Sequence, residues 1–342
     1  MRMLVLGGTW FLGRAVVEDA LARGWDVTTF NRGRSGVDVP GVRPARGDRT
    51  SRDDLARLCA LGPWDVVLDT SSSELSPRDV HLGAAALADR AARYVHISTV
   101  SVYAGWPHEP LTEESEVLDC PYDADAEFGY TGADGSPTKY GFQKAGAENA
   151  IRAAFADRVT MLRPGVILGP GEYVGRLPWW LNRAARGGPI LAPAPHSTVI
   201  QPVDVRDVAR FAVDRAAARE HGTYNVAHPA GVTFAEFIAA CLDVTGGDGH
   251  PVWASPGFLA AHDVAQWTEL PLWRTHSGVW SVDPTAAVKA GLNCRPIAET
   301  VADTWAWLNT GGRPVEHSRA ALHGVAEDKE QRLLQLLAQE RD

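Results

Sequence analysis

The sequence contains few cysteines, and none is arranged for metal binding or for a redox pair. Only four occur in 342 residues, and they lie far apart, at Cys59, Cys120, Cys241 and Cys294. The absence of any CxxC pair disfavours structural zinc, and the histidines show no metal-ligand spacing either. We therefore expect no metal, and reduced thiols in a cytoplasmic protein.

Long apolar runs and an excess of positive charge are also missing. The apolar start at residues 3–6 is far too short to span a bilayer, and Gly7 and Gly8 follow at once. It predicts a first strand, not a signal peptide or a membrane anchor. The formal net charge of −9 disfavours non-specific binding to nucleic acid. Four lysines stand against 29 arginines, a balance typical of a high-GC bacterial source.

Strand-like and helix-like patterns alternate along the first half of the chain. Strands are predicted at residues 3–6, 25–30, 64–69, 94–98 and 159–162, and helices at 12–23, 53–61, 78–93 and 138–154. Apolar strands between helices are typical of a parallel sheet that is covered on both faces. The sequence thus predicts an α/β fold with a doubly wound parallel sheet, which binds ligands beyond the carboxyl ends of its strands.

A glycine-rich segment, GGTWFLG at residues 7–13, joins the first predicted strand to the first predicted helix. Glycine lets the backbone approach a pyrophosphate, and the helix N-terminus supplies free N–H groups and a positive dipole end. The position of the segment after the first strand favours dinucleotide binding over an ordinary turn. The candidate cofactor contacts are Gly7, Thr9, Trp10, Phe11, Leu12 and Gly13.

This segment resembles the glycine loop of the extended short-chain dehydrogenase/reductases, which include the NAD-dependent epimerase/dehydratase family. Those proteins usually carry GxxGxxG. The chain keeps Gly7 and Gly13 but has Trp10 at the middle glycine, which resembles an atypical GGTxFxG subgroup. The resemblance covers about 230 residues and implies a Rossmann fold, an NAD(P) cofactor and an oxidoreductase. It fades in a tryptophan-rich region at residues 253–280.

The resemblance also suggests how the chain divides into domains. We expect residues 1–170 to form the NAD(P)-binding Rossmann domain, with a helix and a strand contributed from about 200–230. Residues 171–325 are expected to form a smaller α/β substrate-binding domain, and 326–342 a terminal helix. Residues 105–137 are rich in Pro, Glu, Asp and Gly and predict a long loop beside the site.

The end of the second predicted strand bears on the choice between NAD and NADP. An NAD enzyme usually has an acid there that binds the ribose 2′-hydroxyl, but this chain has Asn31, followed by Arg32 and Arg34. Arginines pair with a 2′-phosphate, which an acid would repel. We expect NADP, with NAD as the alternative; a solvated basic loop is the other interpretation of these arginines.

Further cofactor contacts follow from the resemblance alone. Asp48 matches the position that binds the adenine amino group, and Thr70 and Ser71 end a strand that lines the cofactor. Segments that resemble the nicotinamide side of the site add Ser98, Pro164 and Val166.

A YxxxK motif supplies the candidate catalytic pair, Tyr140 and Lys144. Its spacing puts both side chains on one helix face, about one turn apart. The Lys144 ammonium favours the phenolate, so Tyr140 can act as a general acid or base on a carbonyl or hydroxyl oxygen. Seven Tyr and four Lys in 342 residues give roughly 0.08 matches by chance.

The segment that closes the preceding strand, ISTVSVY at residues 97–103, resembles the SSxxVYG segment of the family. By that match Thr99 completes the catalytic triad, and its hydroxyl binds the substrate oxygen. Ser101 is the alternative, and both Ser101 and Tyr103 are candidate substrate contacts. The tryptophans, with Trp180 as a candidate, predict either an apolar wall for the substrate or the core of the second domain.

Three departures from the family pattern argue against a nucleotide-sugar substrate. Val166 stands where such enzymes often carry an asparagine, and Ile200 where they carry an arginine that holds the diphosphate. The Thr-Asp-Glu of the 4,6-dehydratases is replaced by Thr99-Val100-Ser101. We expect an NADP-dependent ketoreductase or alcohol dehydrogenase for a small molecule, and a homodimer formed through helices 78–93 and 138–154. A nucleotide-sugar epimerase or dehydratase, and a non-catalytic binding protein, remain as alternatives.

Overall fold

The computed structural model describes residues 1–133, 135–218, 220–312 and 323–340. The chain divides into two compact units. The first comprises Met1–Gly165, Val205–Pro229 and Ser281–Asn293, and the second Val166–Asp204, Ala230–Trp280 and Cys294–Asp342. The chain passes between the units several times, whereas the sequence suggests a first domain at residues 1–170 with a contribution from about 200–230, a second at 171–325 and a terminal helix at 326–342. The segment Ser281–Asn293 belongs to the first unit, and the terminal helix belongs to the second.

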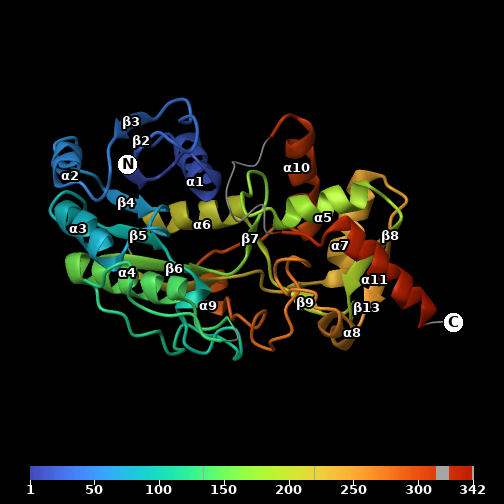
Figure 1. Cartoon of the computed structure of the whole chain (residues 1–342). Helices are drawn as coiled ribbons and strands as arrows, with labels where there is room; N and C mark the ends of the chain where they lie inside the picture. The colour runs from blue at the N-terminus through green and yellow to red at the C-terminus, as the bar shows by residue number, and fades with distance from the viewer. Residues whose placement is uncertain (134, 219, 313–322, 341–342) are drawn as a thin grey trace. The chain divides into compact units, whose positions relative to one another are not determined.

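A seven-stranded parallel sheet forms the centre of the first unit (Figure 1). Its order is β11-β6-β5-β4-β1-β2-β3, and each neighbouring pair runs parallel. The strands are β1 (Arg2–Leu6), β2 (Asp26–Asn31), β3 (Arg43–Arg46), β4 (Val66–Asp69), β5 (Tyr94–Ile97), β6 (Val159–Pro164) and β11 (Gly222–Val226). The strand order reverses at β1, so a ligand is expected beyond the carboxyl ends of β1 and β4.

Helices cover both faces of this sheet. On one face α1 (Phe11–Ala22) packs against α6 (Val205–Ala217), and on the other α3 (Pro77–Leu87) packs against α4 (Lys139–Phe155) (Figure 1). Two further helices are α2 (Arg52–Cys59), which contacts α3, and α9 (Thr285–Lys289), which contacts β11. Because both faces are covered, β1 and β4 are almost entirely enclosed, which explains their continuous apolar sequence.

The second unit has its own apolar core. Trp180 lies at its centre, in edge contact with Phe234 and Phe237. The helices are α5 (Arg176–Ala185), α7 (Phe234–Thr245), α8 (Pro256–Ala261), α10 (Ile297–Asn309) and α11 (Glu327–Gln339). Short strands pair in twos: β7 (Ile167–Leu168) with β10 (Val203–Asp204), β9 (Val199–Ile200) with β12 (Val232–Thr233), and β8 (Pro189–Pro193) with β13 (His250–Ala254).

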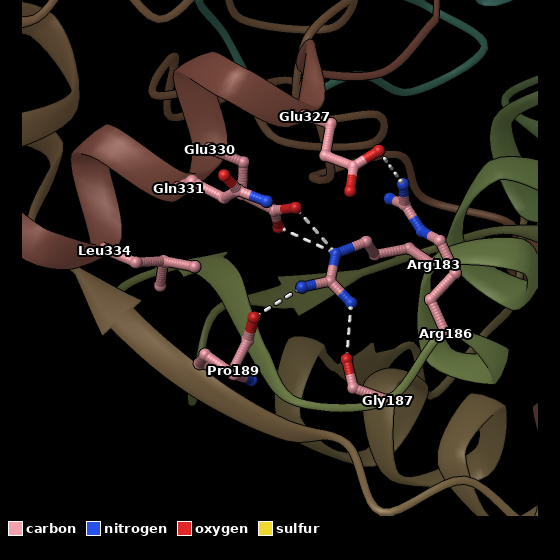
Figure 2. Close-up of a pocket in the computed structure, with 8 residues that line it drawn as sticks. All are labelled: Arg183, Arg186, Gly187, Pro189, Glu327, Glu330, Gln331 and Leu334. Carbon is pink, nitrogen blue, oxygen red and sulfur yellow. Dashed lines mark hydrogen bonds and ion pairs between the residues drawn. The ribbon is translucent and has the colours of Figure 1, made fainter.

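A buried ion pair fastens the terminal helix α11 to this unit (Figure 2). The Arg183 Nε donates to both Glu330 oxygens, at 2.9 and 2.7 Å, and its other nitrogens donate to the carbonyls of Gly187 and Pro189. Glu330 also accepts the backbone N–H of Leu191. The residues that make these bonds line the pocket drawn in Figure 2. We therefore assign this pocket a structural role, the attachment of α11 to the rest of the second unit.

The predicted fold class is confirmed, and most predicted elements lie within a few residues of the observed ones. The helix predicted at 78–93 is wrong in length: α3 ends at Leu87, because the chain then turns so that Ala91 bridges to Trp64. The terminal helix expected at 326–342 includes residues 341 and 342, which lie outside the described residues, as does residue 219. The sequence missed the strands β3, β7, β8, β9, β10, β12 and β13 and the helices α8, α9 and α10.

Candidate active site

The glycine loop has the tight geometry that its sequence predicts. Gly7 and Gly8 have φ of +107° and +96°, which side-chain-bearing residues rarely adopt. A Cβ on Gly13 would lie 2.8 Å from the Gly8 nitrogen and 2.7 Å from the Thr70 Oγ1. Trp10, at the N-cap of α1, provides no side-chain cap. The close-packed glycine loop thus leads directly into the first turn of a helix, the arrangement that a pyrophosphate would require.

A basic segment lies beyond the end of β2. Asn31 is held by the protein itself: its Nδ2 donates to the Gly7 carbonyl at 3.0 Å, and its Oδ1 accepts from the Gly33 N–H and from Arg46. Arg46 also pairs with Asp38. Arg32 and Arg34 are exposed. The sequence anticipates these two arginines but misses Arg46, because the polar strand β3 that carries it has no apolar periodicity.

Asp48 lies close to the same arginines. Its carboxylate accepts from the backbone N–H and the hydroxyl of Thr50, at 2.9 and 2.8 Å. These two bonds, and then the charges of Arg32 and Arg34, lower the pKa of Asp48. Asp48 therefore stays ionised close to this basic segment, but its Oδ1 already accepts both hydrogen bonds from Thr50.

Thr70 and Ser71 follow β4 and lie against the glycine loop. The Thr70 Oγ1 donates to the Leu6 carbonyl at 3.1 Å. The Ser71 Oγ accepts from Arg49, and the Ser71 N–H donates to Asp69. Thr9, in the loop itself, shares a 3.0 Å hydrogen bond with Ser35. The structure thus brings Gly7, Gly13, Thr70 and Ser71 together.

Tyr140 and Lys144 lie on α4, one turn apart. The helix begins after Thr138, whose side chain accepts the Gly141 N–H at 3.0 Å. Tyr140 is partly exposed in the first turn, whereas Lys144 is 3% exposed. The Lys144 Nζ donates to the Ile97 carbonyl at 2.6 Å and to the Ser72 Oγ at 3.0 Å.

Burial changes the acid–base character of Lys144. Removal from water lowers its pKa from 10.5 to about 8, although the negative charges of Asp69 and Glu148 oppose this shift. The group therefore titrates in a range where proton transfer at neutral to mildly alkaline pH is feasible.

The segment that carries Thr99 and Ser101 lies against the start of α4. The Thr99 side chain caps the short 3-10 helix Val100–Val102 by accepting the Ser101 N–H at 3.2 Å, and its Oγ1 lies 3.3 Å from the Ser101 Oγ. A Cβ on Gly141 would collide with the Ser101 carbonyl. Gly141 therefore allows the close approach that places the Tyr140 turn beside Thr99 and Ser101.

Ser98 and Tyr103 serve a buried network. The Ser98 Oγ donates to the Glu148 Oε1 at 2.6 Å, and Arg163 binds the same carboxylate through two nitrogens, at 2.8 and 2.6 Å. The Arg163 guanidinium lies over the Tyr103 ring, whose hydroxyl donates to Asn225. Tyr103 is fully buried, so its predicted role as a substrate contact is not supported by its position.

Trp180 has no exposed face for a substrate. It is 2% exposed, and its indole N–H donates to the Pro271 carbonyl at 2.9 Å. The alternative that the sequence left open, a core tryptophan of the second unit, fits this position. Pro164 ends β6 in the first unit, and Val166 begins the second unit, where its carbonyl accepts the Val203 N–H.

The structure adds buried residues that the sequence did not single out. Arg49 makes a two-pronged ion pair with Asp69, at 2.8 Å for each bond. Tyr94 donates to the same carboxylate at 2.8 Å, and His96 lies between Asp69 and Lys144. Burial alone would raise the pKa of the Asp69 carboxyl, but Arg49 and His96 hold it well below its usual range.

No sequence motif identifies the buried group of Arg49, Asp69 and His96. Arg49 follows β3, Asp69 ends β4 and His96 belongs to β5, so only the sheet brings them together. The one sequence signal is that Asp69 and His96 interrupt strands that are otherwise apolar, because a charged residue is rarely buried without a partner.

In the part of the chain that the structure describes, no group of three or more His, Cys, Asp or Glu side chains is arranged to hold a metal ion. Across the same residues, no helix combines the length and the apolar character that crossing a bilayer demands.

Known proteins share both the sequence pattern and the fold. Residues 3–227 match the NAD dependent epimerase/dehydratase family. A 2′-dehydrokanamycin reductase of Streptomyces kanamyceticus is 31% identical over 197 residues, which are 55% of this chain and 50% of that protein. The chloroplast stem-loop binding protein of 41 kDa b of Arabidopsis thaliana is 25% identical over 263 residues, 72% of this chain and 63% of that protein. These matches thus span about half to two thirds of the relatives' length.

Solved structures share the fold at low identity. The Bordetella bronchiseptica enzyme WbmH, solved with NAD+, has a TM-score of 0.68 at 18% identity and covers 91% of this chain and 99% of its own. A Thermotoga maritima UDP-glucose 4-epimerase, solved with UDP-glucose, has a TM-score of 0.67 at 18% identity, over 91% of this chain and 99% of its own. The family match, the parallel sheet and the glycine loop agree: the chain belongs to the NAD-dependent epimerase/dehydratase family.

Proposed function

We propose that the chain is an NADP-dependent ketoreductase for a small-molecule carbonyl. The observation that carries the proposal is the Tyr140–Lys144 pair on α4, with Thr99 beside its first turn and the glycine loop in the same unit. The similarity to a 2′-dehydrokanamycin reductase supports reduction of a ketone on a polar small molecule.

The residues of the glycine loop fit a dinucleotide. Side chains at Gly7 or Gly13 would collide with Thr70, so this turn requires glycine, and it lies at the start of α1, where a pyrophosphate would bind. Arg32 and Arg34 favour the 2′-phosphate of NADP over NAD. When bound, the cofactor would supply hydride to the substrate carbon.

The chain's own residues would handle the proton and the substrate oxygen. The Thr99 hydroxyl, with Ser101 as the alternative, would hold the carbonyl oxygen. The Tyr140 hydroxyl would donate the proton as the oxygen gains negative charge. The charge of the Lys144 ammonium would stabilise the resulting phenolate, and the N–H group that donates to the Ser72 Oγ would turn to the nicotinamide ribose.

Turnover measurements test this proposal. The purified protein is incubated with NADPH, or with NADH, and a panel of ketones that includes keto-sugars and keto-aminoglycosides, and the loss of absorbance of the reduced cofactor is followed. Tyr140→Phe should lower kcat by about 10²- to 10⁴-fold, and the exposed Tyr122 provides a matched Tyr→Phe control. Turnover that is undiminished in Tyr140→Phe would contradict the mechanism.

A nucleotide-sugar epimerase is the second candidate, because the solved structures of this fold include a UDP-glucose 4-epimerase. The buried, apolar Ile200 argues against it, since it offers no donor to a diphosphate. An epimerase would retain its cofactor and regenerate it in each cycle. Mass analysis of the purified protein for bound NAD(P) and for UDP- or TDP-sugars separates the two candidates.

A non-catalytic role is the lesser alternative, and the similarity to a stem-loop binding protein supports it. The net charge of −9 argues against it, because phosphate contacts need clustered positive charge. We further propose a cytoplasmic homodimer that pairs through α3 and α4, which pack against each other on one face of the sheet. Light scattering measures that oligomeric state.

A further inference from the structure

Lys144 belongs to a buried row of charged and polar groups below the carboxyl ends of β4 and β5. The His96 Nε2 lies 3.5 Å from the Lys144 Nζ, and the His96 Nδ1 lies 3.7 Å from the Asp69 Oδ2. His96 and Asp69 are both 0% exposed. The imidazole therefore stands between an ammonium and a carboxylate, with no access to water.

The far end of the row is rigid. Arg49 binds both Asp69 oxygens, and Tyr94 donates a third hydrogen bond to this carboxylate. Two-pronged guanidinium–carboxylate pairs fix geometry as well as charge. Asp69 is thus a fixed negative charge that faces one nitrogen of His96.

This placement determines the form of the imidazole. The Asp69 carboxylate lies 3.7 Å from Nδ1, beyond hydrogen-bond distance, but its negative charge favours the tautomer that carries the proton on Nδ1, so that Nε2 presents a lone pair to the Lys144 ammonium. Burial, and then the charge of Lys144, lower the pKa of His96, so the ring is neutral at neutral pH. The three N–H bonds of Lys144 then point to Ser72, to the Ile97 carbonyl and to His96.

We propose that His96, oriented by the Arg49–Asp69 pair, is a positioning residue that holds the Lys144 ammonium in place for catalysis. The inference rests on the proposed function in one respect, that Lys144 assists Tyr140. His96 contributes a neutral hydrogen-bond acceptor, which stabilises the ammonium without adding charge.

The groups that face Lys144 set the direction of the expected change. They are Ser72 after β4, Asp69 of β4, His96 and the Ile97 carbonyl of β5, Glu148 of α4, and Arg49 behind Asp69. Removing His96 deletes an acceptor but leaves all these charges unchanged. The charged form of Lys144 then loses a partner, so its pKa should fall further below about 8.

The first experiment measures this pKa without any assay of activity. The chain has only four lysines, at Lys139, Lys144, Lys289 and Lys329, so ¹³Cε-lysine labelling gives four NMR signals to follow against pH. His96→Leu should lower the pKa of Lys144 by about one unit. His96→Gln retains an acceptor toward Lys144 and a donor toward Asp69, and it should restore most of the wild-type value.

A control separates positioning from loss of stability. Val95 is the buried neighbour of His96 on β5, and its side chain points to the opposite face of the sheet. Val95→Ala should weaken the fold while leaving the titration of Lys144 unchanged. If His96→Leu fails to fold, His96→Asn replaces it. Its shorter amide cannot reach Lys144 and Asp69 at once, so it should lower the pKa of Lys144 in the same direction.

The second experiment is the pH profile of kcat with NADPH and an accepted ketone. Reduction needs the protonated Tyr140–Lys144 pair, so activity falls on the alkaline side. His96→Leu should shift that fall to lower pH by the amount seen in the NMR titration, and His96→Gln should reverse it. An unchanged Lys144 pKa in His96→Leu overturns the inference. If the wild type reduces no ketone, the proposed function fails while the NMR titration still decides the role of His96.

Discussion

At the scale of single residues, the choice of cofactor depends on charge at the end of β2. Arg32 and Arg34 are exposed, and their charges act on Asp48. Each arginine that binds a 2′-phosphate contributes a charge-assisted hydrogen bond of about 1.5–3 kcal/mol. Arg32→Ala and Arg34→Ala should therefore each weaken NADPH binding by roughly 10- to 100-fold.

Calorimetric titration with NADPH and NADH measures this effect. The Kd for NADH should remain within a factor of about two, because NADH has no 2′-phosphate to lose. Arg90→Ala removes an exposed arginine after α3 and serves as the matched control. Equal losses of affinity for the two cofactors would show that the arginines do not recognise the 2′-phosphate.

The candidate site could be predicted from the sequence where its residues share a motif. Tyr140 and Lys144 lie one turn apart on a helix, so their proximity follows from helical geometry alone. Arg49, Asp69 and His96 come from three separate segments: the pairing of β4 with β5 sets Asp69 beside His96, and Arg49 reaches Asp69 from the segment after β3. The sequence predicts the acid–base pair, but not the buried groups that surround its lysine.

At the scale of elements, the connection from β1 to α1 should tolerate no added side chain. A Cβ on Gly13 meets both the Gly8 backbone and Thr70, so Gly13→Ala must displace the loop from the start of α1. We expect at least a roughly tenfold loss of affinity for the cofactor, because the backbone donors to the pyrophosphate move. Titration of the variant with NADPH checks this.

Gly83 in α3 provides the control for that substitution. A Cβ there meets nothing within 4 Å, and alanine is favoured over glycine in a helix by roughly 0.5–1 kcal/mol. Gly83→Ala should raise the unfolding midpoint and leave cofactor binding unchanged. Wild-type affinity in Gly13→Ala would mean that the loop does not bind the pyrophosphate.

The elements that the sequence predicts well are those with a strong local pattern. α4 and α7 begin directly after Thr138 and Thr233, whose side chains cap the helices, and both starts could be predicted from the residue type. β3 has the sequence RPAR, and β13 contains a proline, so neither shows the alternation of a half-buried strand. Those strands exist because a neighbouring strand offers hydrogen bonds, which no local pattern reveals.

At the scale of the whole molecule, buried ionisable groups make the free energy of unfolding depend on pH. The pKa of Lys144 is lowered from 10.5 to about 8 in the folded chain. Between these two values the unfolded chain binds more protons at this residue than the folded chain does. Stability from this group therefore rises as pH increases from about 8 toward 10.

Urea unfolding of wild type and Lys144→Met at pH 7.5 and pH 10 isolates this contribution. A shift of about 2.5 units corresponds to roughly 3 kcal/mol, of which roughly 2 kcal/mol should be gained by pH 10. Buried Tyr94 and Cys241 have raised pKa values, so they contribute the opposite slope, but they do so equally in both proteins. Relative to Lys144→Met, the wild type should therefore gain stability as the pH rises.

Lys139→Met is the control for the loss of one lysine. Lys139 is the first residue of the same helix and pairs with Glu127, 3.0 Å away and exposed. Its variant should retain the full wild-type dependence on pH. If Lys144→Met and Lys139→Met show the same slope, Lys144 is not buried as a low-pKa amine, and the proton chemistry proposed for the Tyr140–Lys144 pair loses its physical basis.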